Sequence, residues 1–495
     1  MKQKLLTCLL FILPFLAIAQ DEAPPLITDF YQGAKEMPES FILNDHVNIM
    51  EFKNDNEDYN IIAVDDQMQT LWNTPIQGDV ISASKFKDKV LIVTSTEFSK
   101  IKSNNNTFKA YLLDPANGKV LIEKVIFDGP QDYLVFPFVF TGDGNIFKFA
   151  VRQSSFERRL HVGLPGLFAL ISLDRYYKEL RDTKDFDVID FDEHLEPITK
   201  IKPVKNVGTF LDMTANNHGD LFINWFNDGN MNIVKYEAGK GTPASQLSCA
   251  VTIDEGVLHN FENHILISPS KKNYNVLYYA LMFKNSDKEM ELGIGKLDYS
   301  TGKSVYANEL LTKDNIKELK KSFVPVNKKM DSPDLGYIKG MNVRTLTEVG
   351  DRVIVTITSR STVSGNYSVS ELEYNILINA YDTDLKLKYQ QLVPTSYACL
   401  NRLLPMGYYH DSDKFYVLSN DKHGINTFRG TYSVFNLETG ECEKMYWLTK
   451  KYIANYDLVG GSSALWFKNS FVVPYLHVKG MAGAKFDVTL QQNSY

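Results

Sequence analysis

The sequence predicts an all-β protein built from a repeated unit. Short runs of Val, Ile, Leu, Phe and Tyr alternate with clusters of Gly, Asn, Asp and Lys about every ten residues, which is typical of strands and turns. One kind of turn is a polar pair directly before an apolar run. Its seven copies are marked by Asp88, Gly144, Gly219, Tyr274, Asp351, Asp413 and Asn469, with a mean spacing of roughly 63 residues.

A second kind of turn follows a strand and contains Asp or Asn, polar residues and often Gly. Clear copies lie at 111–119, 296–303, 380–386 and 435–441, and weaker ones at 188–195 and 235–241. Gly118 suits the positive φ of such a turn, and the leading Asp can accept hydrogen bonds from the turn's own backbone. The two turns alternate along the chain, so each unit has four short strands. We therefore expect a single-domain β-propeller of about seven blades over residues 41–495, preceded by a lead-in over 20–40.

The chain ends indicate how the ring closes. Residues 61–72 resemble the second kind of turn without a first-kind turn before them, whereas the last unit lacks a clear second turn. We expect strands within residues 41–75 to pair with strands between Leu465 and Leu490, which removes the exposed sheet edges. In the longest connection between blades, Thr312 can cap a helix over Lys313–Phe323 with Ile316 on its apolar face.

The hairpins LDPANGK at 113–119 and LDYSTGK at 297–303 resemble the blade motif of pyrroloquinoline-quinone-type propellers. This resemblance implies the shape of a propeller blade. The tryptophan that closes the motif is replaced by Ile122, Tyr306 and Lys444 in three hairpins, and we expect no cofactor.

The first 19 residues predict export. Two lysines precede the apolar run Leu5–Leu16, and Ala17-Ile18-Ala19 is a small-x-small cleavage site. The run is too short to span a bilayer, and Cys8 lies inside it rather than after it, which speaks against a lipid anchor. We expect a mature chain that is periplasmic, outer-membrane-associated or secreted.

Composition excludes several function classes. The 53 Lys and Arg against 60 Asp and Glu give a net charge of −7, which argues against a nucleic-acid binder. No C-x-x-C or H-E-x-x-H spacing predicts a metal site, and Cys249, Cys399 and Cys442 allow at most one disulfide. The segment at 460–464 only approximates a nucleophile elbow, and we interpret it as a loop.

Acidic residues crowd the segment DFDVIDFDEH at 185–194. On a strand, Asp185 and Asp187 share one face while Asp190 and Asp192 share the other, so a single cation could reach at most two of them. Calcium needs six to eight oxygen ligands. We interpret the segment as a charged outer blade strand that discourages edge pairing.

The order of the turns predicts a binding face. If both kinds of turn lie on one face of the disc, the remaining connections emerge on the other, and these are the longer ones. They lie at 152–165, 358–373, 420–430 and after Leu311. Their basic and aromatic residues form the candidate partner-binding set: Arg158, Arg159, His161, Arg360, Tyr367, His423, Phe428 and Arg429.

We expect a non-enzymatic binding or scaffold propeller of the cell envelope that engages an envelope protein or an acidic glycan. One alternative is a propeller enzyme that acts on a carbohydrate or other small substrate through carboxylates in the central funnel. A further alternative is an outer-membrane β-barrel, although the strand runs here are shorter than barrel strands and often apolar on both faces.

Overall fold

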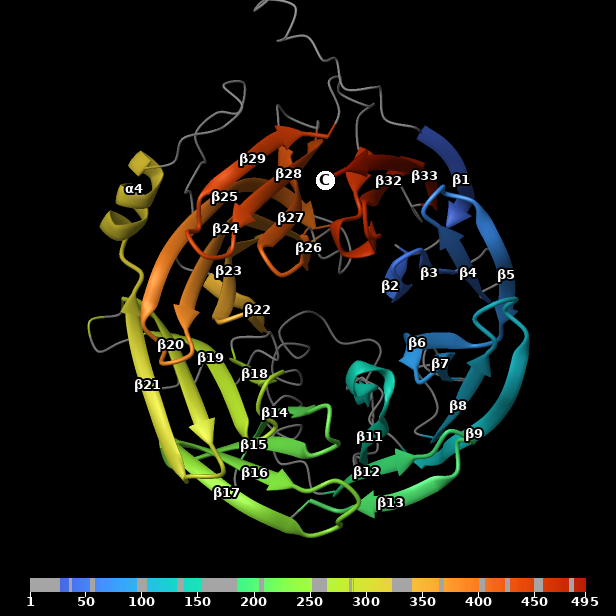
Figure 1. The fold of residues 1–495 in the computed structure, drawn as a ribbon, viewed down its shortest axis with the longest axis horizontal. Helices are drawn as coiled ribbons and strands as arrows, with labels where there is room; N and C mark the ends of the chain where they lie inside the picture. Colours follow the sequence, from blue (N-terminus) through green and yellow to red (C-terminus); the bar gives the residue numbers. More distant parts are fainter. Residues whose placement is uncertain are drawn as a thin grey trace, which may run out of the picture.

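The computed structural model describes most of the chain from residue 27 onwards. The described residues are 27–34, 38–53, 58–95, 105–130, 138–153, 185–203, 209–251, 265–284, 287, 289–322, 341–364, 369–399, 406–422, 428–448, 457–479 and 485–495. They form a ring of antiparallel sheets around a common centre (Figure 1). The chain is an all-β propeller.

The ring contains eight blades, numbered here in chain order, and strands run from the centre outwards within each of the first seven. Blade 1 comprises β2 (Glu39–Asn44), β3 (Val47–Lys53), β4 (Tyr59–Asp65) and β5 (Thr70–Ile76), and blade 2 comprises β6 (Asp79–Phe86), β7 (Lys89–Ser95), β8 (Asn105–Leu113) and β9 (Val120–Pro130). Blade 3 comprises β10 (Phe138–Phe140), β11 (Phe147–Gln153), β12 (Asp185–Phe191) and β13 (Pro197–Ile201), and blade 4 comprises β14 (Thr209–Ala215), β15 (Leu221–Asn227), β16 (Asn230–Tyr236) and β17 (Pro243–Ala250). A short 3-10 helix, η1 (Gly142–Gly144), joins β10 to β11.

The remaining blades follow the same plan. Blades 5 to 7 comprise β18 (Ile265–Pro269), β19 (Val276–Lys284), β20 (Met290–Asp298) and β21 (Lys303–Leu310); β22 (Met341–Val349), β23 (Arg352–Ser364), β24 (Val369–Asp382) and β25 (Leu387–Cys399); and β26 (Gly407–His410), β27 (Lys414–Lys422), β28 (Phe428–Asn436) and β29 (Cys442–Trp447). Blade 8 contains β30 (Asp457–Val459), β31 (Leu465–Trp466), β32 (Ser470–Lys479), β33 (Lys485–Ser494) and, as its outermost strand, β1 (Ile27–Ala34), with η2 (Gly461–Ser463) between β30 and β31.

The blade count of about seven was wrong by one. The missed unit is blade 1, whose first hairpin turn at Asn44, Asp45 and His46 is also a polar cluster before a strand. Its apolar run is interrupted by Asn48, which hides the pattern. The Asn48 amide is buried and donates to the Trp466 carbonyl of blade 8 at 3.0 Å, so tertiary contact compensates the polar interruption.

Ring closure by an N-terminal strand is confirmed, but the prediction of which strand closes the ring was wrong. Residues 41–75 form blade 1 by pairing among themselves, whereas β1 pairs with β33, with Ile27 opposite Gln491 and Tyr31 opposite Val488. The Tyr31 ring stacks on Phe52 of blade 1 at 4.7 Å between centroids. The closing strand lies earlier in the chain because the strands at 41–75 are used up within blade 1.

The core consists of eight hydrophobic clusters, each between neighbouring blades. The cluster between blades 8 and 1 joins Met50, Ile62 and Val64 to Leu465 and Val488. The other seven clusters connect successive blades in chain order. Most buried apolar area therefore lies between sheets, which explains strand runs that are apolar on both faces.

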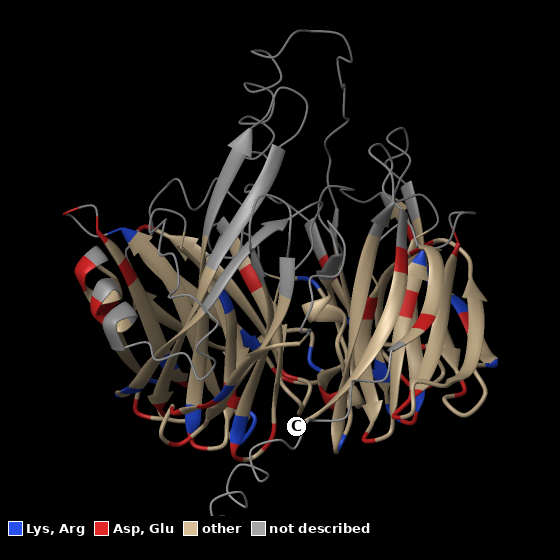
Figure 2. Ribbon diagram, turned by 90° about the horizontal axis from the view of Figure 1, so that it is seen from above, with Lys and Arg blue, Asp and Glu red and all other residues tan. Residues whose placement is uncertain are grey.

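Strand order defines two faces of the disc. The turn face carries the hairpins between the first and second and between the third and fourth strands of each blade, and the loop face carries the other connections. Seen from the side in Figure 2, the turn face is the lower edge, where Asp, Glu, Lys and Arg gather and where the C-terminus lies. Both kinds of turn identified in the sequence therefore lie on one face.

The predicted helix is confirmed as α4 (Lys313–Ser322), between β21 and β22. The Thr312 hydroxyl accepts a hydrogen bond from the Asn315 amide at 3.1 Å and so caps the first turn. Ile316 is buried against the cluster between blades 5 and 6, and α4 contacts β25.

Candidate functional site

The innermost strand of blade 4 carries a carboxyl group with an unusual titration. A β-bulge at Leu211 shifts the register of β14 so that Asp212 lies opposite Asn224. Burial raises the pKa of Asp212 to about 7. The backbone amides of Met213 and Ile267 donate to its carboxyl group at 2.8 and 3.3 Å and offset part of this rise. Ile267 belongs to β18, so Asp212 links the innermost strands of two blades.

The surroundings of Asp212 suit a single acid rather than an acid–base pair. Its described partners are backbone amides, and none is a second carboxyl group. Asn224 lies on the same sheet face, its amide donates to the Met231 sulfur at 3.5 Å, and its buried carbonyl oxygen has no partner among the described residues. Glycoside hydrolysis of the usual kind needs two carboxyl groups at a set separation. This site thus provides one proton that titrates near neutral pH.

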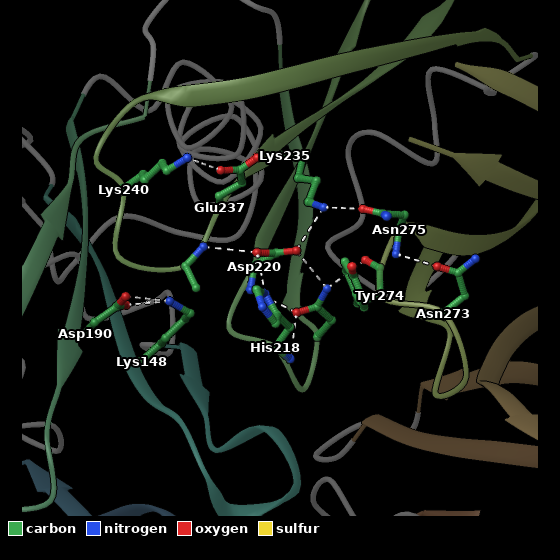
Figure 3. Close-up of polar contacts among 12 residues, drawn as sticks. Lys148, Asp190, His218, Asp220, Lys235, Glu237, Lys240, Asn273, Tyr274 and Asn275 are labelled. Carbon is green, nitrogen blue, oxygen red and sulfur yellow. Dashed lines mark hydrogen bonds and ion pairs between the residues drawn. The ribbon is translucent and has the colours of Figure 1, made fainter. Parts of the chain in front are cut away.

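A larger polar network joins the turn-face hairpins of blades 4 and 5 (Figure 3). The buried Asp220 carboxylate pairs with the Lys235 ammonium at 2.9 Å and accepts a hydrogen bond from the Ala238 backbone amide at 3.0 Å. Lys235 also donates to Asn275 at 2.8 Å, and the Asn216 amide donates to the Tyr274 carbonyl at 2.8 Å. Burial raises the pKa of Asp220, but the hydrogen bonds that its carboxylate accepts, from Lys235 and Ala238 among others, together lower it below the ordinary value. The network fixes the relative position of the two hairpins.

Two exposed rings lie above this network. The His218 ring stacks on Tyr274 with 5.0 Å between centroids, and its Nδ1 lies 3.3 Å from the Asp220 carboxylate (Figure 3). Tyr274 is 54% exposed. Among the large apolar side chains of the described residues, only Ile198 is more exposed. The described contacts of the His218 ring are with Asp220 and Tyr274.

The acidic segment at 185–194 is not an outer strand. It forms β12, the third strand of blade 3, and two of its carboxylates pair with lysines. Both carboxylate oxygens of Asp190 accept hydrogen bonds from the buried Lys148 ammonium at 2.7 Å, and Asp187 pairs with Lys200 at 2.9 Å. Lysines from both neighbouring strands thus neutralise Asp187 and Asp190, and β12 has no free edge because it pairs with β11 and β13. Asp192 accepts backbone amides of its own turn, which lowers its pKa.

The candidate partner-binding residues fall on the loop face or outside the described residues. The backbone of Arg360 lies near the loop-face end of β23, and Phe428 and Arg429 begin β28 in the next blade. Their side chains are not among those described. Arg158, Arg159, His161, Tyr367 and His423 lie outside the described residues.

The described residues give little support to metal binding or to nucleophilic catalysis. Among the described residues no group of three or more His, Cys, Asp or Glu could hold a metal ion. Cys249 and Cys442 are free thiols whose pKa values burial raises, which makes them poor nucleophiles. In the segment resembling a nucleophile elbow, the buried Ser463 hydroxyl donates to the Pro38 carbonyl and so ties η2 to the entry of blade 1. No helix in the described ranges is long and apolar enough to cross a membrane.

Comparisons with known proteins extend only to the fold. No family model and no curated protein matches the chain. Similar solved structures include the WD40 domain of SCAP from fission yeast, with 9% identity, a TM-score of 0.38 and coverage of 94% of this chain and 98% of that chain. A europium-containing methanol dehydrogenase has 9% identity, a TM-score of 0.41 and coverage of 95% and 93%. The β-propeller domain of the Trilobed protease from Pyrococcus furiosus has 9% identity, a TM-score of 0.36 and coverage of 84% and 94%.

The fold is a β-propeller. This assignment rests on the strand pairing of the eight blades. Propellers serve as scaffolds and as enzymes, so function has to be inferred from the chain's own residues.

Proposed function

We propose that this propeller is an exported, non-enzymatic binding module of the cell envelope whose loop face engages an acidic protein surface or an acidic glycan. The observation that carries the proposal is the distribution of connection lengths. The two longest connections between strands, residues 154–184 and 311–340, follow strands that end on the loop face, whereas the turn-face hairpins between described strands are at most six residues long. The predicted long connections at 358–373 and 420–430 lie on the same face but are mostly strand, with only residues 365–368 and 423–427 between the strands. Variable loops on a constant frame are the usual way to build a binding surface.

Charge supports an acidic partner. The chain carries a net charge of −7, yet these connections contribute Arg158, Arg159, Arg360 and Arg429. A cationic patch on an acidic protein steers acidic ligands to one face and repels them elsewhere. Arginine and aromatic rings also stack on flat or apolar ligand surfaces, which favours recognition over simple charge attraction.

The enzyme alternative has one supporting observation, the raised pKa of Asp212. Hydrolysis through funnel carboxylates requires a second group with a complementary role. Because the described partners of Asp212 are backbone amides, binding is the better supported function.

The test uses the mature chain immobilised and exposed to solubilised native envelope, followed by mass spectrometry and by binding of a purified acidic polysaccharide. The variant Arg158→Ala, Arg159→Ala, Arg429→Ala should weaken binding about tenfold, since three charges at roughly 0.5 kcal/mol each sum to about 1.5 kcal/mol. The matched control removes three exposed turn-face lysines, Lys87, Lys240 and Lys386, and should bind normally. Equal binding by the arginine variant and the parent would refute the proposal.

A further inference from the structure

A lysine and a histidine from non-adjacent blades meet on the turn face. Lys271 lies in the hairpin between β18 and β19 of blade 5, and His410 ends β26, the innermost strand of blade 7. The Lys271 ammonium nitrogen is 3.3 Å from His410 Nε2, across blade 6. Both residues lie in or beside first hairpin turns, which places the pair at the inner part of this face.

The nearby carboxylates are occupied by other donors. Glu348 is buried and accepts the Ser270 hydroxyl at 2.7 Å and the Lys271 backbone amide at 2.6 Å. Asp351 pairs with Lys272 instead. Asp411 accepts the Tyr416 hydroxyl at 2.6 Å together with two backbone amides of its own turn. The Lys271 ammonium therefore has no carboxylate partner among the described residues, and its described polar partner is an imidazole.

The pair is electrostatically incomplete. Burial lowers the pKa of His410, and the positive charge of Lys271 lowers it further. At neutral pH a charged ammonium thus faces a neutral imidazole. An anion beside both nitrogens would accept hydrogen bonds from both groups, replace the contact between them and favour protonation of His410.

We propose that Lys271 and His410 form a binding site for an oxyanion, the phosphate or carboxylate group of a ligand. Both groups donate to oxygen in the bound state, and the imidazole takes its second proton from solvent. The charged groups that act on His410 are Asp411 from its own turn and Lys271 from blade 5, and the Tyr409 ring stacks on the imidazole with 6.4 Å between centroids. From β27, Lys414 and Tyr416 donate to Asp411. The segment η2, which also contacts β26, carries no titratable side chain.

This site is independent of the proposed function. It lies on the turn face, opposite the long connections, and it uses none of the candidate loop residues. Failure of one proposal leaves the other intact.

The experiment follows histidine titrations by NMR in the folded mature chain, with and without inorganic phosphate at constant ionic strength set by chloride. His410 is identified among the nine histidines by the variant His410→Gln. Phosphate should raise the pKa of His410 by about 1, because an opposite charge within hydrogen-bond distance shifts a pKa by that order. The exposed imidazoles of His46 and His218 serve as internal controls and should not shift.

Two lysine variants separate a site from general surface charge. Lys271→Gln should raise the pKa of His410 in phosphate-free buffer and abolish the further rise with phosphate. The neighbouring Lys272→Gln, which removes a lysine already paired with Asp351, should leave both values as in the parent. The proposal would be overturned if phosphate left the pKa of His410 unchanged in the parent. It would also be overturned if Lys272→Gln lost the phosphate effect as fully as Lys271→Gln.

Acetate in a parallel titration identifies the ligand group. An equal response to acetate indicates a carboxylate ligand, such as an acidic side chain of a partner, whereas a response to phosphate alone indicates a phosphate group. The same pKa of His410 in chloride alone and with either oxyanion added at matched ionic strength would overturn the proposal.

Discussion

Replacing Tyr31 tests the ring closure most directly. Tyr31 is partly buried on β1, and its ring stacks on Phe52 of blade 1 at 4.7 Å. Its hydroxyl accepts a hydrogen bond from the Asn60 amide at 3.0 Å. The backbone of β1 pairs with β33 of blade 8. Tyr31 is therefore one of the side chains that join the last blade to the first, and Tyr31→Ala removes its contacts without deleting a strand.

The expected loss follows from burial and hydrogen bonding. Truncating a fully buried aromatic ring to Ala costs about 3–5 kcal/mol, and partial burial of Tyr31 reduces this to about 2 kcal/mol. Loss of the hydrogen bond with Asn60 adds about 1 kcal/mol. We expect Tyr31→Ala to lower the free energy of unfolding by about 2–3 kcal/mol, and Tyr31→Phe to lower it by about 1 kcal/mol.

The assay is urea unfolding of the chain from Gln20 onwards, monitored by tryptophan fluorescence and circular dichroism. Thr28→Ala is the control, because Thr28 lies on the same strand and is exposed. A chain that begins at Pro38 lacks β1 and should be less stable than Tyr31→Ala, since it exposes an edge of β33 as well. A loss below about 0.5 kcal/mol for Tyr31→Ala, the size of an ordinary surface substitution, would refute closure through this contact.

Two further predictions concern a turn and a titration. Gly118 and Gly302 occupy equivalent turns at φ of 71° and 69°, but a Cβ at Gly118 would lie 2.5 Å from the Trp72 ring, whereas a Cβ at Gly302 would meet open space. Gly118→Ala should therefore lower the urea midpoint more than Gly302→Ala. Equal effects would contradict the close packing of the Gly118 turn against the ring. The pKa of Asp212 is raised from 3.8 to about 7, so the unfolded chain releases this proton first and stability falls as pH rises from about 4 to about 7. Asp212→Asn should gain stability over the parent across that window, by at most about 4 kcal/mol, and reach a plateau above it; a difference independent of pH in unfolding curves would disprove the raised pKa.

The hairpin chemistry could be predicted from sequence because it depends on residues close in the chain. Asp114 illustrates this: its carboxylate accepts the Ala116 amide two residues on, and Gly118 takes the positive φ that the turn requires. The same local signals define which connections lie on the turn face. Asn44 and Asp45 carried the signal for the missed blade, but the strand after them contains Asn48, whose burial depends on blade 8.

The sequence by itself therefore determined the all-β class, the four-stranded unit and the sharing of one face by both kinds of turn, because each depends on backbone preferences within about ten residues. The tertiary structure decided that eight blades complete the ring and that β1 completes the last of them. It also decided that Lys148 meets Asp190 and that Lys271 meets His410, 139 residues apart. The physical reason is that blade number and distant pairs follow from the packing angles between sheets, summed around a closed circle. No single turn or strand encodes that sum.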